Sequence, residues 1–235
     1  MEKKFNHNNI SDVFFDLDHT LWDFEKNSAL AFKSIFKNKG YKFSIHNFLK
    51  IYNPINHYYW KLYRENIINH KELRIRRLKS SFDMIGIKIN IKEINEISEF
   101  YAEKLLNYNH LIPGAIELLK FLKKKYSLSI ITNGFKKIQN IKVENSGLNQ
   151  FFENIITSEE VGFKKPDPII FKKALEKSIV MPVNSVMIGD SFEADIMGAL
   201  NFGMKAIHFN SHNEKKHNLC PIVYELIEIK EILFD

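Results

Sequence analysis

The sequence predicts an α/β protein in which a parallel sheet, covered by helices on both faces, is interrupted by a block of helices. From Pro113 onward, short apolar runs alternate with helix-length amphipathic segments, the pattern of repeated β-α units. A lone apolar run at residues 13–15 has no strand partner nearby in the sequence, so it must pair with those later strands. Nothing in residues 22–109 has the pattern of a strand. We therefore expect a core domain of residues 1–21 and 110–235 and an inserted helical domain of residues 22–109.

The first strand is predicted from Val13-Phe14-Phe15, a run too short for a helix and bounded by acidic residues. Apolar side chains on successive positions are typical of a strand that is buried on both faces. Asp16 and Asp18 follow at its downstream end. Buried carboxylates are unfavourable unless a cation, a proton or a ligand shares the place. We therefore expect later parts of the chain to supply a partner for these two acids.

The inserted block is predicted to be helical because its apolar residues recur every three or four positions. Helices are predicted at residues 23–38, from about Pro54 to Ile68, at 71–85 and at 91–106. The second carries an aromatic run, whose helical spacing predicts core packing, with stacking on a substrate base as the alternative. This run consists of Tyr58, Tyr59, Trp60 and Tyr63. Arg74, Arg76 and Arg77 in the third predict a solvated helix face, with attraction of nucleotides as the alternative.

Pro113-Gly114 marks the return to strand–helix alternation. Strands are predicted at residues 128–131, 154–157, 185–188 and 205–209. Helices are predicted at residues 115–125, 136–145, 168–177, 192–201 and 224–233, with a polar loop at 210–218. Such β-α units require right-handed crossovers, so the strands run parallel and their carboxyl ends share one edge of the sheet.

Polar residues follow three of these strands at that shared edge, where open α/β sheets bind their ligands. Asp16 and Asp18 follow the first strand, Thr132 and Asn133 follow the second, and Asp190 follows a later one. Asp16 and Asp190, together with a backbone carbonyl at Asp18, are hard oxygen ligands that suit Mg²⁺. The sequence therefore predicts a magnesium site at this edge.

Donors for an anion are predicted beside the acids. Thr132 and the backbone N–H groups of Asn133 and Gly134 suit anionic oxygens. Lys164 and Lys165, which come before Pro166 in the loop after residue 157, offer an ammonium as a positive point charge. A metal, a lysine and several donors around a carboxylate are suited to a phosphoryl group.

Within such a site, Asp16 could attack phosphorus while Asp18 protonates the leaving oxygen and later deprotonates water. Each motif alone has a simpler explanation. An acid-x-acid pair is common on surfaces, Thr132-Asn133-Gly134 is a typical turn, and Asp190 with Asp195 suits the acidic first turn of a helix. The prediction depends on their occurrence together and in this order.

Taken together, these residues resemble the four motifs of the haloacid dehalogenase (HAD) superfamily phosphatases. The stretch 16–20, Asp-Leu-Asp-His-Thr, is similar to the first motif, Thr132 to the second, Lys165 to the third, and Gly189-Asp190 with Asp195 to the fourth. The resemblance covers nearly the whole chain. It implies a Rossmann-like core with the first strand at its centre and an all-helical cap of the C1 type.

The resemblance also implies a role for each matching residue. Asp16 would be the nucleophile that forms an aspartyl-phosphate, and Asp18 the general acid and base. The implied phosphate-binding residues are Thr132, Asn133 and Lys165. The implied Mg²⁺ ligands are Asp16, the Asp18 carbonyl and Asp190, with Asp195 in support.

Two further stretches, residues 131–135 and 158–168, resemble the HAD pyrimidine 5′-nucleotidases, so we expect a phosphatase of nucleoside 5′-monophosphates. The alternatives are a phosphatase of phosphoglycolate or a sugar phosphate, a phosphomutase, or a phospho-ligand sensor without activity. The dehalogenases of the superfamily lack a second aspartate like Asp18, so that residue favours phosphatase chemistry. It does not distinguish a phosphatase from a mutase.

Composition sets the remaining expectations. The formal charge of +6 is spread over many lysines, which favours small anionic substrates over a nucleic acid polymer. A lone cysteine, Cys220, excludes an intrachain disulfide and fits a reducing compartment. Residues 1–9 lack the apolar segment of a signal peptide, and no apolar run is long enough to span a membrane. We expect a cytoplasmic monomer or homodimer.

Overall fold

The computed structural model describes residues 7–234, and the chain divides into two compact units. One unit contains the chain up to Asp23 and from His110 onward, and the other contains Phe24–Asn109. Most of the amino-terminal stretch 1–9, on which the expectation about a signal peptide rested, lies outside the described residues. No helix in the described part of the chain is long and apolar enough to cross a membrane.

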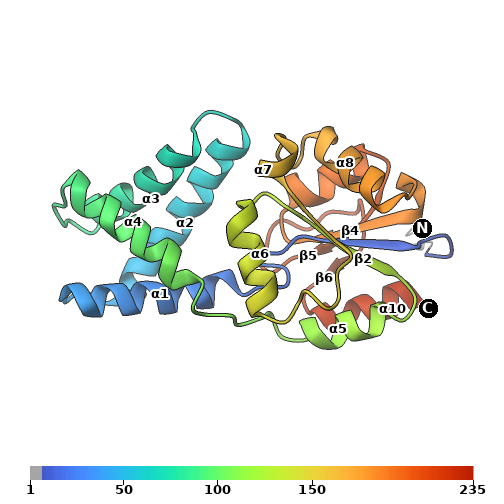
Figure 1. The fold of residues 1–235 in the computed structure, drawn as a ribbon, viewed down its shortest axis with the longest axis horizontal. Coiled ribbons are helices and arrows are strands. Elements are labelled where there is room, and N and C mark those ends of the chain that lie inside the picture. Colours follow the sequence, from blue (N-terminus) through green and yellow to red (C-terminus); the bar gives the residue numbers. More distant parts are fainter. Residues whose placement is uncertain (1–6, 235) are drawn as a thin grey trace. The chain divides into compact units, whose positions relative to one another are not determined.

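The first unit is built on a parallel sheet, which confirms the predicted fold class (Figure 1). Its strands are β1 (Asp12–Phe15), β2 (Ser127–Thr132), β3 (Asn154–Thr157), β4 (Ser185–Gly189), β5 (Lys205–Phe209) and β6 (Ile222–Val223). They are arranged in the order β3-β2-β1-β4-β5-β6. This order reverses at β1, the kind of switch point at which doubly wound sheets bind their ligands.

The central position of β1 follows from its apolar sequence. Val13, Phe14 and Phe15 are fully buried, as expected for a strand covered on both faces. β1 pairs in parallel with β2 on one side and with β4 on the other. The carboxyl ends of β2 and β4 therefore flank the residue that follows Phe15, which is Asp16.

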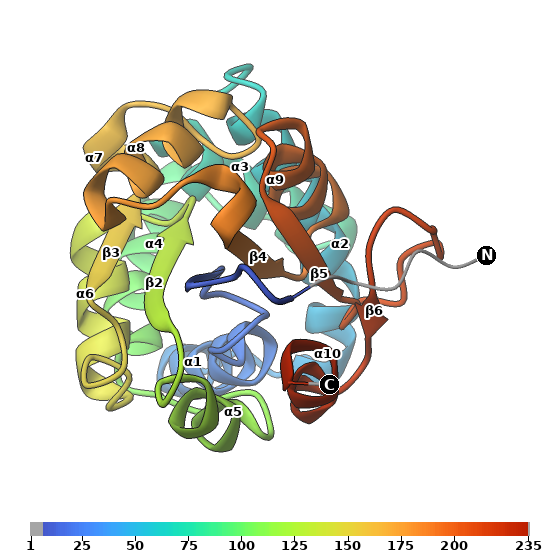
Figure 2. The same cartoon turned by 90° about the vertical axis from the view of Figure 1, so that its right-hand side faces the viewer.

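Helices cover both faces of the sheet. They are α5 (Ala115–Leu122), α6 (Lys136–Asn145), α7 (Ser158–Val161), α8 (Pro168–Ser178), α9 (Gly198–Asn201) and α10 (Ile229–Phe234). α8 and α9 lie over one face, and α5 and α10 over the other (Figure 2). Apolar side chains of α8, such as Phe171, pack against Phe14 and Met187 of the sheet and form a buried core.

Some elements differ from the predicted ones. The predicted helix 192–201 is a π-helix at Phe192–Met197 followed by the single turn of α9. β6 was not predicted because two residues are too few to show a strand pattern. The predicted helix at 224–233 begins only at Ile229, because a capping box between Glu225 and Glu228 forms a 3₁₀ turn first.

All regular elements in residues 24–109, which form the second unit, are helices. They are α1 (Phe24–Lys39), α2 (Ile45–Arg64), α3 (His70–Met84) and α4 (Ile91–Leu105). The predicted start of α2 at about Pro54 was wrong, because Ser44 caps a helix that begins at Ile45. Pro54 lies inside this helix, and the helix continues beyond it while burying Phe48 and Tyr52. Packing of that apolar face outweighs the unfavourable proline.

The aromatic core of this unit is not the predicted one. Tyr58 is 58% exposed, and Tyr59, Trp60 and Tyr63 are only partly buried. The fully or nearly fully buried aromatic side chains are instead Phe32, Phe36, Phe48, Tyr52, Phe82 and Tyr101. The run Tyr58–Tyr63 therefore lies largely at the surface of its unit.

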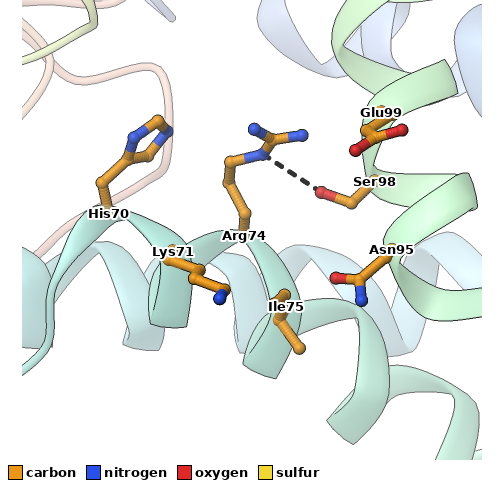
Figure 3. A pocket seen from close by; sticks show the side chains of 7 residues that line it. All are labelled: His70, Lys71, Arg74, Ile75, Asn95, Ser98 and Glu99. Carbon is orange, nitrogen blue, oxygen red and sulfur yellow. Dashed lines mark hydrogen bonds between the residues drawn. The ribbon is translucent and has the colours of Figure 1, made fainter. Parts of the chain in front are cut away.

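The predicted solvated arginine face was wrong for Arg77. Its guanidinium is buried, donates to Asn56 Oδ1 at 2.7 Å and lies over the Tyr101 ring at 5.5 Å. Arg74 is half-buried and donates from Nε to Ser98 Oγ at 3.1 Å. It lines a hollow of about 240 Å³ between α3 and α4 (Figure 3). Only Arg76 is exposed, beside Glu72.

Candidate active site

The carboxyl ends of β1 and β4 bring together the predicted acidic residues. Asp16 directly follows β1, and its backbone N–H donates to the Ile188 carbonyl of β4 at 2.9 Å. Asp190 directly follows β4, and Asp195 lies in the π-helix after it. One carboxylate oxygen from each of the three acids lies within 4.8 Å of the others, and all three residues are buried. The structure thus forms a carboxylate cluster from segments far apart in the sequence.

Lys165 lies against two acids of this cluster, Asp16 and Asp195. Its ammonium contacts Asp16 Oδ1 at 2.6 Å and Asp195 Oδ1 at 2.7 Å, and donates to the Ile131 carbonyl at 2.6 Å. The side chain is 1% exposed. Buried lysines are rare unless they are paired, and here the ammonium donates two hydrogen bonds, to Asp16 and to the Ile131 carbonyl, and forms an ion pair with Asp195. Lys165 therefore ties the ends of β1 and β2 to the π-helix.

The charges of the cluster do not balance. Burial raises the pKa of Asp16 well above its ordinary value; Lys165 opposes this, and the neighbouring Asp195 and Asp190 carboxylates add to it. Burial likewise raises the pKa of Asp195. For Lys165, burial would lower the pKa, but the Asp16 and Asp195 carboxylates outweigh it and the pKa is raised. Three carboxylates against one ammonium leave an excess of about two negative charges when all are ionised.

This excess is what a divalent cation would neutralise. The donors are carboxylate oxygens, the ligand type that Mg²⁺ prefers. Asp195 is the least available of the three, because Oδ1 contacts Lys165 and Oδ2 accepts from the Ser191 N–H at 3.0 Å. Asp16 and Asp190 therefore fit as direct ligands and Asp195 as a support.

Gly189 makes the close approach of Asp195 to the strand end possible. A Cβ atom at Gly189 would lie 2.3 Å from Asp195 Oδ2, a distance that real structures do not show. Steric contact with Asp195 thus explains why a glycine precedes Asp190 in the fourth motif. The glycine makes room for one acid while the next residue presents another.

Asp190 is held by groups that favour its charged form. Thr20 Oγ donates to its Oδ1 at 3.2 Å, and His212 Nε2 lies 3.2 Å from its Oδ2. Burial alone would raise the pKa of Asp190, but His212 and His19 with Lys165 outweigh it and the pKa is lowered. Its backbone carbonyl accepts from Nε2 of the buried His208 at 3.0 Å. Asp190 is therefore the carboxylate of the cluster that most readily stays ionised.

Thr132, the last residue of β2, is oriented by its neighbours. Its Oγ1 accepts from the Gly134 N–H at 3.1 Å and from Gln139 Nε2 at 2.6 Å. Because those bonds use both acceptor sites of the hydroxyl, its own hydrogen is left to donate. A donor fixed in this way suits an anionic oxygen. The Gly134 N–H, which was predicted to serve an anion, donates to Thr132 in this structure.

Asn133 positions the lysine loop with its side chain. Its Oδ1 accepts from the Lys165 N–H at 2.7 Å, and its Nδ2 donates to the Lys165 carbonyl at 2.9 Å. This pair of bonds ties the loop after β3 to the end of β2. The side chain of Asn133 is thereby engaged, so a phosphate-binding role would fall to its backbone N–H.

Asp18 has two partners that the sequence did not reveal. Lys142 Nζ donates to Asp18 Oδ1 at 2.5 Å, and Gln139 Nε2 donates to Asp18 Oδ2 at 2.9 Å. Both partners come from α6, where they lie three residues apart on one face. His212 was missed as well, because its loop was predicted only as polar. A buried i, i+3 polar pair cannot be told from a solvated one by periodicity alone.

Comparison with known proteins gives matches over nearly the whole chain. The family model described as haloacid dehalogenase-like hydrolase matches residues 13–209. The pyrimidine 5′-nucleotidase YjjG of Escherichia coli K12 is 31% identical over 94% of this chain and 96% of its own length. The pyrimidine 5′-nucleotidase PynA of Streptococcus pneumoniae is 30% identical over 94% of this chain and 92% of its own. The glyceraldehyde 3-phosphate phosphatase of Pyrococcus furiosus is 33% identical over 95% and 93%.

Solved structures of haloacid dehalogenase-type proteins also match over nearly the whole chain. The HAD-hydrolase YfnB of Bacillus subtilis, bound to magnesium, superposes with a TM-score of 0.87 and 26% identity, covering 97% of this chain and 100% of that one. The L-2-haloacid dehalogenase RSc1362 superposes with a TM-score of 0.75 at 16% identity, covering 97% and 100%, which shows a shared fold alone.

Proposed function

The chain belongs to the haloacid dehalogenase-like hydrolase family and is a phosphatase of that family. We propose that it is a Mg²⁺-dependent nucleoside 5′-monophosphate phosphatase and that Asp16 is its nucleophile. The observation that carries the proposal is the buried cluster of Asp16, Asp190 and Asp195 around Lys165. Its excess negative charge calls for a divalent cation, and donors for an anion lie beside it.

The proposed reaction has two displacements at phosphorus. An Asp16 carboxylate oxygen forms a bond to phosphorus while the ester P–O bond breaks, and Asp18 gives its proton to the leaving oxygen. The alcohol departs and an aspartyl-phosphate remains on Asp16. Water then attacks phosphorus, Asp18 takes a proton from it, and the P–O bond to Asp16 breaks. Inorganic phosphate leaves, and both aspartates return to their starting states.

The other residues of the site prepare these steps. Lys165 opposes the rise in the pKa of Asp16 and so favours the ionised, nucleophilic form. Thr132 donates its hydroxyl hydrogen, and the Lys165 loop is held in place by Asn133. Mg²⁺, when bound by Asp16, Asp190 and the Asp18 carbonyl, would neutralise charge on the phosphoryl oxygens. Together they give the preorganised field on which phosphoryl transfer depends.

The substrate class is proposed from the relatives. The two pyrimidine 5′-nucleotidases match over more than nine-tenths of this chain. A second candidate class is small phosphorylated sugars and acids, because the glyceraldehyde 3-phosphate phosphatase of Pyrococcus furiosus matches equally well. A phosphomutase remains compatible with Asp16 and Asp18, since both reactions use the same acids. We place the protein in the cytoplasm because its lone cysteine fits a reducing compartment.

A panel of monophosphates tests the proposal. Purified protein with Mg²⁺ is assayed for phosphate release from UMP, dUMP, dTMP, glyceraldehyde 3-phosphate, phosphoglycolate and a hexose phosphate. The account expects the highest kcat/KM for the pyrimidine nucleotides and no turnover in chelator or by Asp16→Asn. Equal or greater kcat/KM on the sugar phosphates would overturn the nucleotidase assignment. Transfer of phosphate between positions of one substrate, without release, would indicate a mutase.

A further inference from the structure

Two of the three residues that helix α6 buries are polar, and only Val143 is apolar. Gln139 is fully buried and Lys142 is 3% exposed, whereas Ile138 and Ile141 of the same helix are only partly buried. Lysine is among the residues least often buried, and isoleucine among the most often. A helix stabilised only by apolar contact would place isoleucine on the inner face. The two polar side chains therefore need a reason other than packing.

That reason is found at Asp18, where the two carboxylate oxygens each have a partner of their own. Lys142 Nζ contacts Oδ1 at 2.5 Å, and Gln139 Nε2 contacts Oδ2 at 2.9 Å. Lys142 is held from the other side by the buried Trp22 ring, 4.2 Å from Nζ. Gln139 also donates to Thr132 Oγ1 at 2.6 Å, which links Asp18 to the end of β2.

The backbone around Asp18 is already fixed, so these contacts act on its side chain. The His19 N–H donates to the Trp22 carbonyl, and the Trp22 N–H donates to the Leu17 carbonyl, which closes a tight turn. His19 adopts a left-handed conformation within it, with φ of 67°. The Asp18 side chain, 23% exposed, would retain rotamer freedom without its two partners.

We propose that Lys142, aided by Gln139, is a positioning residue that holds the Asp18 carboxyl group where it meets the leaving oxygen. The inference rests on the proposed function, in which Asp18 carries the proton. Catalytic groups lose about 10²-fold in rate when misplaced by about 1 Å, so a fixed carboxyl group has a clear benefit. Stability alone does not explain the pair, because a buried ion pair is often no more stabilising than apolar side chains of similar size.

The identity of the leaving group reports on Asp18 directly. A phosphate ester with a weakly basic leaving group, p-nitrophenyl phosphate, departs with little help from a proton. Phenyl phosphate has a similar shape and a more basic leaving group, so it depends more on the general acid. A residue that positions Asp18 should therefore matter more for phenyl phosphate, whereas a residue needed only for folding should affect both substrates alike.

The test compares Lys142→Met with Lys137→Met, an exposed lysine on the same helix. For Lys142→Met we expect kcat/KM on phenyl phosphate, which reports formation of the aspartyl-phosphate, to fall about 10- to 100-fold more than kcat/KM on p-nitrophenyl phosphate. Lys137→Met should retain the wild-type ratio. In an Asp18→Asn background, adding Lys142→Met should lower kcat/KM by less than about twofold, because the effect of Lys142 acts through Asp18. If Lys142→Met does not fold, Lys142→Gln, which also removes the charge, is used with the same expectations.

Several results would overturn the inference. An equal loss of kcat/KM on both esters would show that Lys142 acts on folding or on substrate binding and not on proton transfer to the leaving oxygen. A full multiplicative loss in the Asp18→Asn background would show that Lys142 acts independently of Asp18. Wild-type protein that turns over neither ester with Mg²⁺ would overturn the proposed function itself, and this inference with it. That result is distinct from the others because it concerns the wild type.

Discussion

Replacing Lys165 with methionine tests the charge balance of the active site. The substitution removes an ammonium that contacts Asp16, Asp195 and the Ile131 carbonyl at 2.6–2.7 Å. Breaking a buried ion pair by removing one partner typically costs about 3–5 kcal/mol, because the remaining charge is left buried without compensation. Folded domains are stable by only about 5–15 kcal/mol. We therefore expect the variant to lose a large part of its free energy of unfolding.

The assay is urea unfolding in chelator and in Mg²⁺, with Lys164→Met as the matched control. Lys164 is the adjacent lysine and is only partly buried, so we expect its loss to cost less than about 1 kcal/mol. A cation that binds only the folded state stabilises it by about 2.7 kcal/mol at a concentration of about 100 Kd. Mg²⁺ should therefore restore part of the stability of Lys165→Met. Equal losses in the two variants, or a Lys165→Met variant as stable as wild type in chelator, would refute the reasoning.

Further predictions concern stability and the anion site. Burial raises the pKa of Asp12 above its ordinary value of 3.8, so the contribution of the Asp12 carboxyl group to folding stability is present below pH 3.8 and is lost as the pH rises through the pKa of the folded state. Asp12→Asn should therefore raise Tm near neutral pH and give no such increase in acid. A thermal unfolding curve without an increase in Tm near neutral pH would contradict this. Arg77→Met should cost about 1–3 kcal/mol in urea unfolding, because it removes the shorter of the two hydrogen bonds to the buried Asn56 Oδ1 and leaves only the 3.4 Å bond from the Tyr52 hydroxyl. The exposed Arg76→Met should cost less than about 1 kcal/mol, and similar costs for the two variants would count against the buried role of Arg77. Thr132→Val should lower kcat/KM on p-nitrophenyl phosphate at least about tenfold while Thr132→Ser retains it, and a Val variant as active as wild type would remove Thr132 from the site.

Most strands of the core could be predicted because local pattern and tertiary environment agree there. Asn154–Thr157 and Lys205–Phe209 have the bounds predicted for them. The predicted start of α2 failed because Pro54 was taken as a helix start, while Ser44 ten residues earlier is the cap. The aromatic run Tyr58–Tyr63 shows the limit of periodicity, which indicates a helix but not which face is covered. The covered face of α2 is the one that carries Phe48 and Tyr52, because these side chains pack on Phe32.

Most of the predicted site residues came from strand ends, where sequence and topology together specify a place; Lys165 and Asp195, which lie in a loop and in the π-helix, were assigned from the resemblance. Asp16, Thr132 and Asp190 were predicted to share an edge because parallel strands in one sheet end together. Gln139 and Lys142 could not be found in this way, because on a helix such residues are usually solvated. Only the packing of α6 against Trp22 and Asp18 shows that they are buried.

The proposed aspartyl-phosphate is tested most directly by trapping it. Asp18→Asn, which is expected to slow hydrolysis of the intermediate more than its formation, is mixed with p-nitrophenyl phosphate and Mg²⁺ and quenched in acid, and its peptides are analysed by mass spectrometry. We expect a phosphoryl group on the peptide that contains Asp16, and none in the double variant that also carries Asp16→Asn. Nitrophenol release by wild type without any protein-bound phosphate in this variant, or undiminished turnover by Asp16→Asn, would contradict it.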